Sequence, residues 1–244
     1  MRKSAIVIGA SSGLGRSISY QLAQKGYNLI LSSRNKDTLF LLGQELKKYT
    51  ITVEIIPLDL ESTSYESSND FVSSCFNAFN NINEVYLTSA IIDERDYGNS
   101  VPEVLEKINN INYRGSALII SAFAKKLNQF FSRIVVVSSI AAIRPRSKNI
   151  AYSASKVALE YHIQSLQHYY SASPMKLQFF RIGYMDTQMS KDQELLFKKQ
   201  SPESVARFIL KSTKQNNAYY PKFWFIIALI LNSLPWVLYR RLKF

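Results

Sequence analysis

The most informative segment of this 244-residue chain is Gly9-Ala10-Ser11-Ser12-Gly13-Leu14-Gly15. It follows a short apolar run at residues 5–8 and precedes a helical pattern over residues 14–24. Glycines between a strand and a helix let backbone amides, and the positive end of the helix, approach a pyrophosphate. The spacing is G-x-x-x-G-x-G rather than G-x-G-x-x-G, and a purely structural turn is the alternative. The position of the turn predicts a dinucleotide site formed by Gly9, Ser11, Ser12, Gly13, Leu14 and Gly15.

Short apolar runs alternate with longer helical patterns along the chain, which indicates βαβ units and a parallel sheet. We expect strands at residues 5–8, 28–32, 53–57, 84–88, 133–137, 177–181 and 218–220. Helices are expected near residues 14–24, 36–49, 67–79, 102–124, 152–170 and 201–214. The prediction is an α/β fold: a single doubly wound Rossmann domain over residues 1–221, whose seven-stranded parallel sheet binds its ligand at the carboxyl ends of the strands.

The composition suits a globular protein, with 47% apolar residues and a formal net charge of +12. The charge favours an anionic partner, such as an acidic membrane surface or a phosphate-bearing ligand, unless it serves only solubility. Nucleic acid is not expected, because no nucleic-acid-binding signature is present. One cysteine, Cys75, excludes an intrachain disulfide, and no metal site is predicted. The chain starts directly with its first strand, so we expect no signal peptide and a cytoplasmic location.

The end of the second expected strand indicates the choice of cofactor. An acidic residue there usually binds the ribose 2′-hydroxyl of NAD. This chain has Ser32-Ser33-Arg34 instead. The Arg34 guanidinium suits a 2′-phosphate, and Ser33 leaves room for it. The residues therefore favour NADPH over NAD, unless Arg34 only caps the second helix or stacks on adenine.

Tyr152 and Lys156 lie four residues apart on an expected helix, so they share one face. A free tyrosine, with a pKa of about 10, is a poor acid–base group at neutral pH. A neighbouring ammonium favours the phenolate and lowers that pKa. The Y-x-x-x-K spacing is common by itself, but joined to the glycine-rich turn it predicts hydride transfer to a carbonyl.

With these motifs, the sequence resembles the short-chain dehydrogenase/reductase family over roughly residues 3–221. The resemblance implies that Tyr152 donates the proton to the developing alkoxide. It implies that Lys156 holds the nicotinamide ribose and lowers the pKa of Tyr152. Ser139 matches the serine that orients the carbonyl, and Asn112 matches the asparagine that supports a proton-relay water.

The same resemblance implies further cofactor contacts, together with two departures from the family pattern. Asp59-Leu60 matches the pair that contacts adenine, and Gly183 and Thr187 match a segment that grips the carboxamide and diphosphate. Where the family usually has Asn-Asn-Ala-Gly, this chain has Thr88-Ser89-Ala90-Ile91, in which Ser89 and Ala90 are expected at the cofactor and Ile91 adds bulk. The usual Pro-Gly is Ile182-Gly183. Neither departure removes a reacting group.

Residues 222–244 form an apolar and basic tail. Its apolar run is broken by Asn232-Ser233 and falls short of the about 20 residues of a transmembrane helix. Tryptophans with a basic end, Arg240-Arg241, suit a membrane interface with anionic headgroups. We expect a monotopic anchor on the cytoplasmic face of a membrane. A true span, or a tail that packs on a neighbouring subunit or covers the substrate cleft, is the alternative.

These features predict an NADPH-dependent carbonyl reductase whose ketone substrate is lipid-linked or membrane-associated. The tail is similar to those of reductases that act on keto-sugars carried by polyprenyl phosphate. The family resemblance implies a homodimer or homotetramer. The alternatives are a soluble reductase of a small ketone or ketoacyl substrate, with the tail as an oligomer interface, and a non-catalytic NADP-binding scaffold, which the altered residues 88–91 favour slightly.

Overall fold

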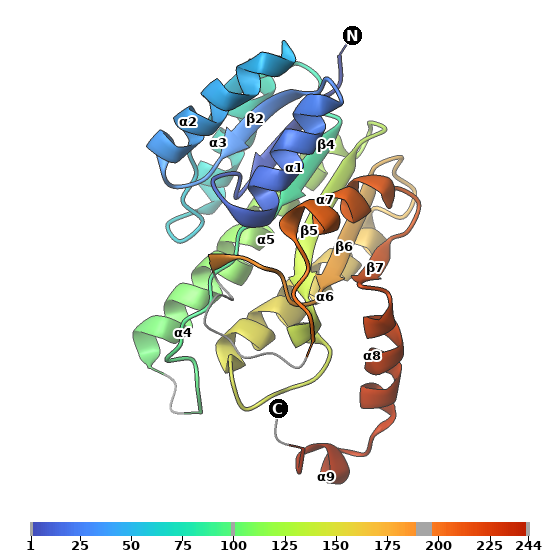
Figure 1. Ribbon diagram of the computed structural model, residues 1–244. Coiled ribbons are helices and arrows are strands. Elements are labelled where there is room, and N and C mark those ends of the chain that lie inside the picture. Colours follow the sequence, from blue (N-terminus) through green and yellow to red (C-terminus); the bar gives the residue numbers. More distant parts are fainter. Residues whose placement is uncertain (1, 99–100, 189–196, 243–244) are drawn as a thin grey trace.

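The computed structural model describes residues 2–98, 101–188 and 197–242 (Figure 1). One parallel sheet has the strand order β3-β2-β1-β4-β5-β6-β7. Its strands are β1 Ser4–Ile8, β2 Asn28–Ser32, β3 Val53–Ile55, β4 Glu84–Leu87, β5 Arg133–Ser139, β6 Lys176–Ile182 and β7 Asn217–Tyr220. The chain winds outward from β1 in one direction and from β4 in the other, as in doubly wound folds. The predicted α/β fold with seven parallel strands is confirmed.

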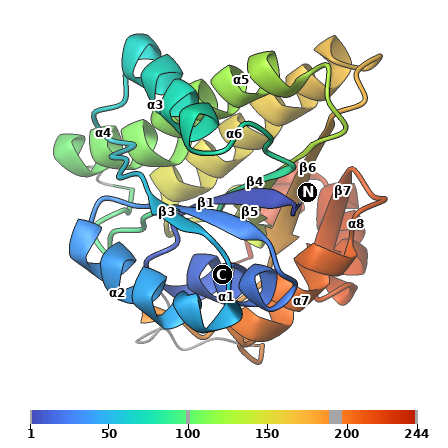
Figure 2. The ribbon, with the colours of Figure 1, turned by 90° about the horizontal axis from the view of Figure 1, so that it is seen from above.

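The helices cover both faces of the sheet, as Figure 2 shows from above: α1, α2 and α7 on one face, and α3 to α6 on the other. Their bounds are α1 Gly13–Gln24, α2 Lys36–Leu46, α3 Tyr65–Ala78, α4 Pro102–Asn109, α5 Ser116–Leu127, α6 Ile150–Tyr169 and α7 Pro202–Lys211. Side chains alternate across a strand, so Ile6 and Ile8 of β1 enter the core under α3 and α5, whereas Ala5 and Val7 enter the core under α1 and α2. Burial on both faces explains the continuously apolar strands.

The expected helix over residues 102–124 is in fact two helices, α4 and α5, joined by a π-helical turn at Asn110–Gly115. The Ser116 hydroxyl donates to the carbonyl of Ile111, 2.8 Å away, which supports the wide turn. At Gly115 a Cβ would lie 2.0 Å from the carbonyl oxygen of Leu60, so only glycine allows this approach. Such turns frequently occur at functional sites, and this one contains Asn112.

Strand β5 is two residues longer than predicted and ends at Ser139. The extension pairs with β6, where Ser139 lies opposite Ile182. Seven registered pairs join the two strands, the longest pairing in the sheet. Ser139 is therefore held rigidly at the carboxyl end of a central strand.

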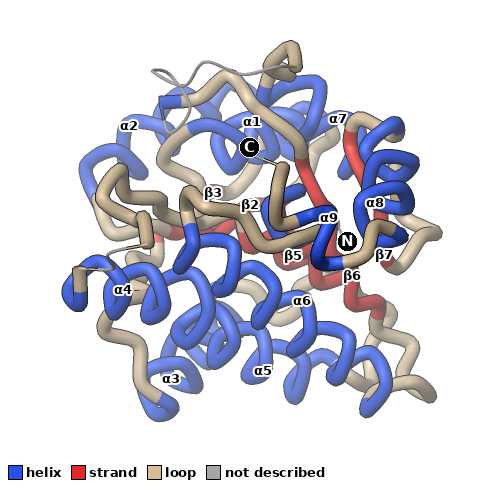
Figure 3. Tube along the Cα trace, turned by 90° about the horizontal axis from the view of Figure 1, so that it is seen from below, coloured by secondary structure: helices blue, strands red, loops and turns tan. Residues whose placement is uncertain are grey.

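The tail forms two short helices, α8 Phe223–Ser233, which packs beside β7, and α9 Trp236–Tyr239, which follows it (Figure 3). One side packs on the body of the protein through Trp224, Ala228 and Tyr239, which are buried. The other side is exposed and apolar, because Ile226 and Leu229 are more than half exposed. Across the described ranges, we found no helix with the length and apolarity needed to cross a membrane.

Candidate active site

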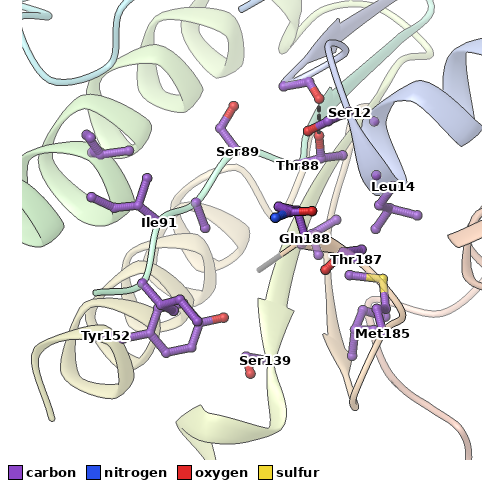
Figure 4. Close-up of a pocket in the computed structure, with 18 of the residues that line it drawn as sticks. Ser12, Leu14, Thr88, Ser89, Ile91, Ser139, Tyr152, Met185, Thr187 and Gln188 are labelled. Atoms are coloured by element: carbon purple, nitrogen blue, oxygen red, sulfur yellow. Dashed lines mark hydrogen bonds between the residues drawn. The ribbon is translucent and has the colours of Figure 1, made fainter. Parts of the chain in front are cut away.

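A cleft of about 640 Å³ lies at the carboxyl ends of the strands. Figure 4 shows the first turn of α1 with Ser12 and Leu14 at one end, and Ser139 and Tyr152 at the other. All but one of the sequence-predicted site residues line the cleft: Gly9, Ser11, Ser12, Gly13, Leu14, Gly15, Ser33, Arg34, Asp59, Leu60, Ser89, Ala90, Ser139, Tyr152, Lys156, Gly183 and Thr187. The fold therefore brings together residues that lie up to 178 positions apart, from Gly9 to Thr187 (187 − 9).

The glycine-rich turn is shaped by two close backbone approaches. Gly9 has φ of 92° and Gly13 has φ of 49°, a region that disfavours other residues. A Cβ on Gly15 would lie 2.0 Å from the carbonyl oxygen of Gly9. Ser12, the N-cap of α1, makes no side-chain hydrogen bond to the first turn. Amides of that turn are therefore available to an anion.

Asn112 is the predicted site residue that does not line the cleft. It is fully buried, and its amide bonds both backbone groups of Ile91: it accepts from the nitrogen at 2.8 Å and donates to the oxygen at 2.9 Å. It also donates to the hydroxyl of Ser155 at 3.3 Å. Asn112 thus fixes the segment after β4, which forms one wall of the cleft, to α6. The Ile91 side chain, which adds bulk at this wall, packs against two apolar clusters of the core.

Tyr152, Lys156 and Ser139 converge from α6 and β5. The Lys156 ammonium lies 5.8 Å from the centre of the Tyr152 ring and donates to the carbonyl of Val137 at 3.1 Å. Asp96, which sequence reasoning missed, caps α6: its carboxylate accepts from the amides of Ala151 and Tyr152 at 2.8 and 2.9 Å. This capping fixes the first turn of α6, and with it the Tyr152 ring.

The electrostatics of the pair differ from expectation. Burial raises the pKa of Tyr152, and it outweighs a hydrogen bond with Ser139 and the positive charge of Arg146, which both lower that pKa. Burial also lowers the pKa of Lys156 to about 8, although the Glu160 carboxylate acts in the opposite direction. Arg146 is thus a cation whose charge lowers the pKa of Tyr152, in addition to the expected Lys156, whose ammonium donates to the carbonyl of Val137.

A buried polar network lies next to Lys156 on the side away from the cleft, and no signal in the sequence predicted it. Glu160, one turn after Lys156, accepts from the Ser138 hydroxyl at 2.5 Å. It also pairs with the Arg181 guanidinium of β6 at 2.5 Å. Arg181 in turn donates to the Tyr219 hydroxyl on β7. The network joins α6 to three strands directly behind the cleft.

Two predicted cofactor residues have neighbours that the sequence did not reveal. The Arg34 side chain is 56% exposed and lies 3.9 Å from the carboxylate of Glu61, so this pair is weak and leaves the guanidinium accessible. At Gly183, a Cβ would lie 2.5 Å from the indole nitrogen of Trp224. The glycine is therefore required by the tail helix, which packs directly on the turn after β6.

Comparisons with known proteins agree with this geometry. A family model described as short chain dehydrogenase matches residues 3–195. An uncharacterized oxidoreductase of Staphylococcus saprophyticus is 26% identical over 218 residues, covering 87% of this chain and 92% of that protein. The 11-beta-hydroxysteroid dehydrogenase-like 2 protein of Arabidopsis thaliana is 28% identical, covering 96% and 78%. The structure of an alcohol dehydrogenase from Thermococcus sibiricus, in complex with 5-hydroxy-NADP, superposes with a TM-score of 0.80 at 22% identity, covering 90% and 96%.

The buried network yields a stability prediction. Glu160→Gln leaves the Arg181 guanidinium without its carboxylate, and breaking a buried pair in this way costs about 3 kcal/mol in the free energy of unfolding. The matched control is Glu45→Gln, which breaks the exposed pair with Arg16 and costs at most about 1 kcal/mol. Chemical denaturation of both variants tests the difference. Equal losses would mean that the Glu160 pair contributes no more than a surface pair.

Proposed function

The chain belongs to the short-chain dehydrogenase family, and we propose that it is an NADPH-dependent carbonyl reductase. The observation that carries the proposal is one continuous cleft with the glycine-rich turn at one end and Ser139, Tyr152 and Lys156 at the other. A dinucleotide held along this cleft by the turn would have its nicotinamide end at the hydroxyl-bearing side chains. No other group of the cleft wall offers a comparable proton donor beside a buried cation among the described residues.

The residues present fit a nicotinamide dinucleotide. The turn can fold this tightly against the end of β4 only because Gly9 and Gly15 lack side chains, as a Cβ on either would lie within 2.8 Å of a neighbouring atom. The uncapped first turn of α1 offers amides to the diphosphate. Asp59 and Leu60 would border the adenine, and Thr187 the diphosphate. The bound cofactor would supply a hydride to the carbonyl carbon.

The chain itself would supply the proton. The raised pKa of Tyr152 keeps its hydroxyl protonated at neutral pH, so it can donate a proton to the carbonyl oxygen as negative charge develops there. The Ser139 hydroxyl would orient the same oxygen. Lys156, with a pKa of about 8, is mostly charged at neutral pH and stabilises the tyrosinate that remains. Solvent then returns a proton to Tyr152, and the alcohol leaves.

The preference for NADPH rests on Arg34 and Ser33, which line the cleft after β2. No acidic residue stands at these two positions to bind a ribose 2′-hydroxyl. An exposed guanidinium can donate two hydrogen bonds to a 2′-phosphate. The Thermococcus sibiricus enzyme, which is in complex with an NADP analogue, gives this assignment indirect support.

We extend the proposal to a lipid-associated ketone and a membrane surface. The exposed face of α8 is apolar and consists of Phe225, Ile226, Leu229 and Ile230. The short helix α9 also exposes apolar side chains, those of Trp236, Val237 and Leu238. The exposed Arg240 and Arg241 border this face, whereas Lys243 lies outside the described residues. An apolar face bordered by cations is typical of helices that lie in the interface of an anionic membrane. The Arabidopsis thaliana relative is named for a steroid, which is also a lipid.

Replacement of the phenol tests the chemistry. Tyr152→Phe should lower kcat for NADPH-dependent reduction of reactive ketones at least about 100-fold, because the proton donor is lost. NADPH affinity should remain unchanged. The control is Tyr161→Phe, which alters an exposed tyrosine of the same helix. If Tyr152→Phe retained full activity in an absorbance assay, the proposed mechanism would fail, and if the wild type bound NADPH without turnover, the scaffold interpretation would replace it.

A second variant tests cofactor choice. Arg34→Ala should raise the Kd for NADPH about 10- to 100-fold, because it removes a charge-assisted hydrogen bond to the 2′-phosphate. The Kd for NADH should remain unchanged, because NADH lacks that phosphate. Fluorescence titration with both cofactors measures the change, with Arg16→Ala as a surface control. An equal loss for NADPH and NADH would show that Arg34 stacks on adenine or only orders the loop.

Vesicle flotation tests the membrane surface. The wild type should float with vesicles of phosphatidylcholine and phosphatidylglycerol, and less with phosphatidylcholine alone. Replacing Ile226, Leu229 and Ile230 with serine should abolish flotation, whereas the control Phe40→Ser/Leu41→Ser, on α2, should not. Flotation that is equal for both variants contradicts the proposal. A wild-type dimer that the tail variant converts to a monomer identifies the tail as a subunit interface instead.

A further inference from the structure

The loop of residues 143–149, between the short helix Ile140–Ala142 and α6, carries three cations with different surroundings. Arg144 faces the tail, where its guanidinium donates to the carbonyl of Leu231 at 3.0 Å and to that of Leu234. Lys148 is exposed and pairs through its backbone with Tyr97. Arg146 alone of the three lines the cleft. Its guanidinium is the cation whose charge lowers the pKa of Tyr152.

Among the described residues, no carboxylate is paired with Arg146. Within residues 2–98, 101–188 and 197–242, no ion pair and no side-chain hydrogen bond of its guanidinium is present. Two acidic residues of the described part of the cleft wall, Asp59 and Asp186, form no ion pair with it. Asp96 lies nearby at the start of α6, but its carboxylate is already bonded to two backbone amides. A half-buried guanidinium in the same cleft as the reacting hydroxyl is therefore available to an external anion.

The backbone is held on both sides of Arg146, by the tail before it and by Asp96 after it. The Tyr239 hydroxyl donates to the carbonyl of Pro145 at 2.6 Å, and the ring of Tyr239 lies 4.6 Å beneath the guanidinium of Arg144. Tyr239 is 5% exposed, so these contacts are shielded from water. On the other side, the amide of Asn149 donates to the carbonyl of Asp96 at 2.8 Å. A side chain on so fixed a loop is pre-organised for binding.

We propose that Arg146 binds an anionic group of the substrate, a phosphate or a carboxylate, beside the carbonyl that is reduced. The inference rests on the proposed function, because it takes Tyr152 as the reacting group. Arg146 is not required to bind the cofactor phosphates, because the glycine-rich turn and Arg34 would bind them at the other end of the cleft. The planar guanidinium group can donate two parallel hydrogen bonds to either a phosphate or a carboxylate. The substrate class is therefore an anionic ketone.

Binding of small anions to the NADP-loaded protein tests this inference. The probes are glycerol 3-phosphate and acetate, with glycerol as the uncharged counterpart, and calorimetry measures each Kd. Arg146→Met should weaken binding of glycerol 3-phosphate about 10- to 100-fold, as loss of a charge-assisted bond predicts, and Arg146→Lys should restore part of it. The control Arg207→Met, on the exposed side of α7, should bind like the wild type. Unchanged anion binding in Arg146→Met overturns the inference.

Further binding measurements distinguish a lipid-borne phosphate, a free phosphate and a carboxylate as the anionic group. Short-chain phosphatidate that binds more tightly than glycerol 3-phosphate identifies a lipid-borne phosphate, and equal affinities identify a free one. Acetate that binds more tightly than glycerol 3-phosphate identifies a carboxylate. Failure of the wild type to bind NADP itself would overturn the proposed function, whereas intact NADP binding without anion binding would overturn only the role of Arg146.

Discussion

The buried ammonium of Lys156 is the constraint on which the rest of the site depends. The residue is 2% exposed, and a cation at such a position needs partners within the protein. The Val137 carbonyl bonds it directly, and the Glu160 carboxylate one turn away favours its charge. Because Glu160 is itself buried, it requires the Arg181 guanidinium and the Ser138 hydroxyl. One charge at the centre of the cleft thus determines the polar residues at the ends of β5 and β6.

Much of the fold and of the candidate site could be predicted from the sequence, because its signals are local. Strand positions follow from apolar runs, and the turn from the spacing of Gly9, Gly13 and Gly15. The wide turn around Asn112 could not be predicted, since it depends on the approach of Gly115 to Leu60, far away in the chain. The partners of Glu160 lie 21 and 22 residues away on other elements, and hydrophobic periodicity carries no information on such pairs. For the same reason the sequence indicated the composition of the tail but not that Trp224 covers Gly183.

The tail and the cleft are parts of one arrangement. Trp224 packs on the turn after β6, and Tyr239 holds the loop that carries Arg146. The side of the tail that faces away from these contacts is apolar and exposed. A membrane-bound tail would therefore bring the loop with Arg146 near the lipid headgroups. The proposed anion binding by Arg146 and the proposed membrane binding by the tail are therefore compatible.

Isotope transfer from the cofactor to the ketone tests whether this cleft is a site of hydride transfer. The protein is given NADPH that carries deuterium at the nicotinamide C4 position, on either face, together with a reactive ketone, and the alcohol is analysed by mass spectrometry. We expect that one labelled form transfers deuterium to the carbonyl carbon and that the other does not, because the cleft would present a single face of the cofactor to Tyr152. An unlabelled alcohol from both forms, or no alcohol with NADPH bound, would contradict the assignment of this cleft as a site of hydride transfer.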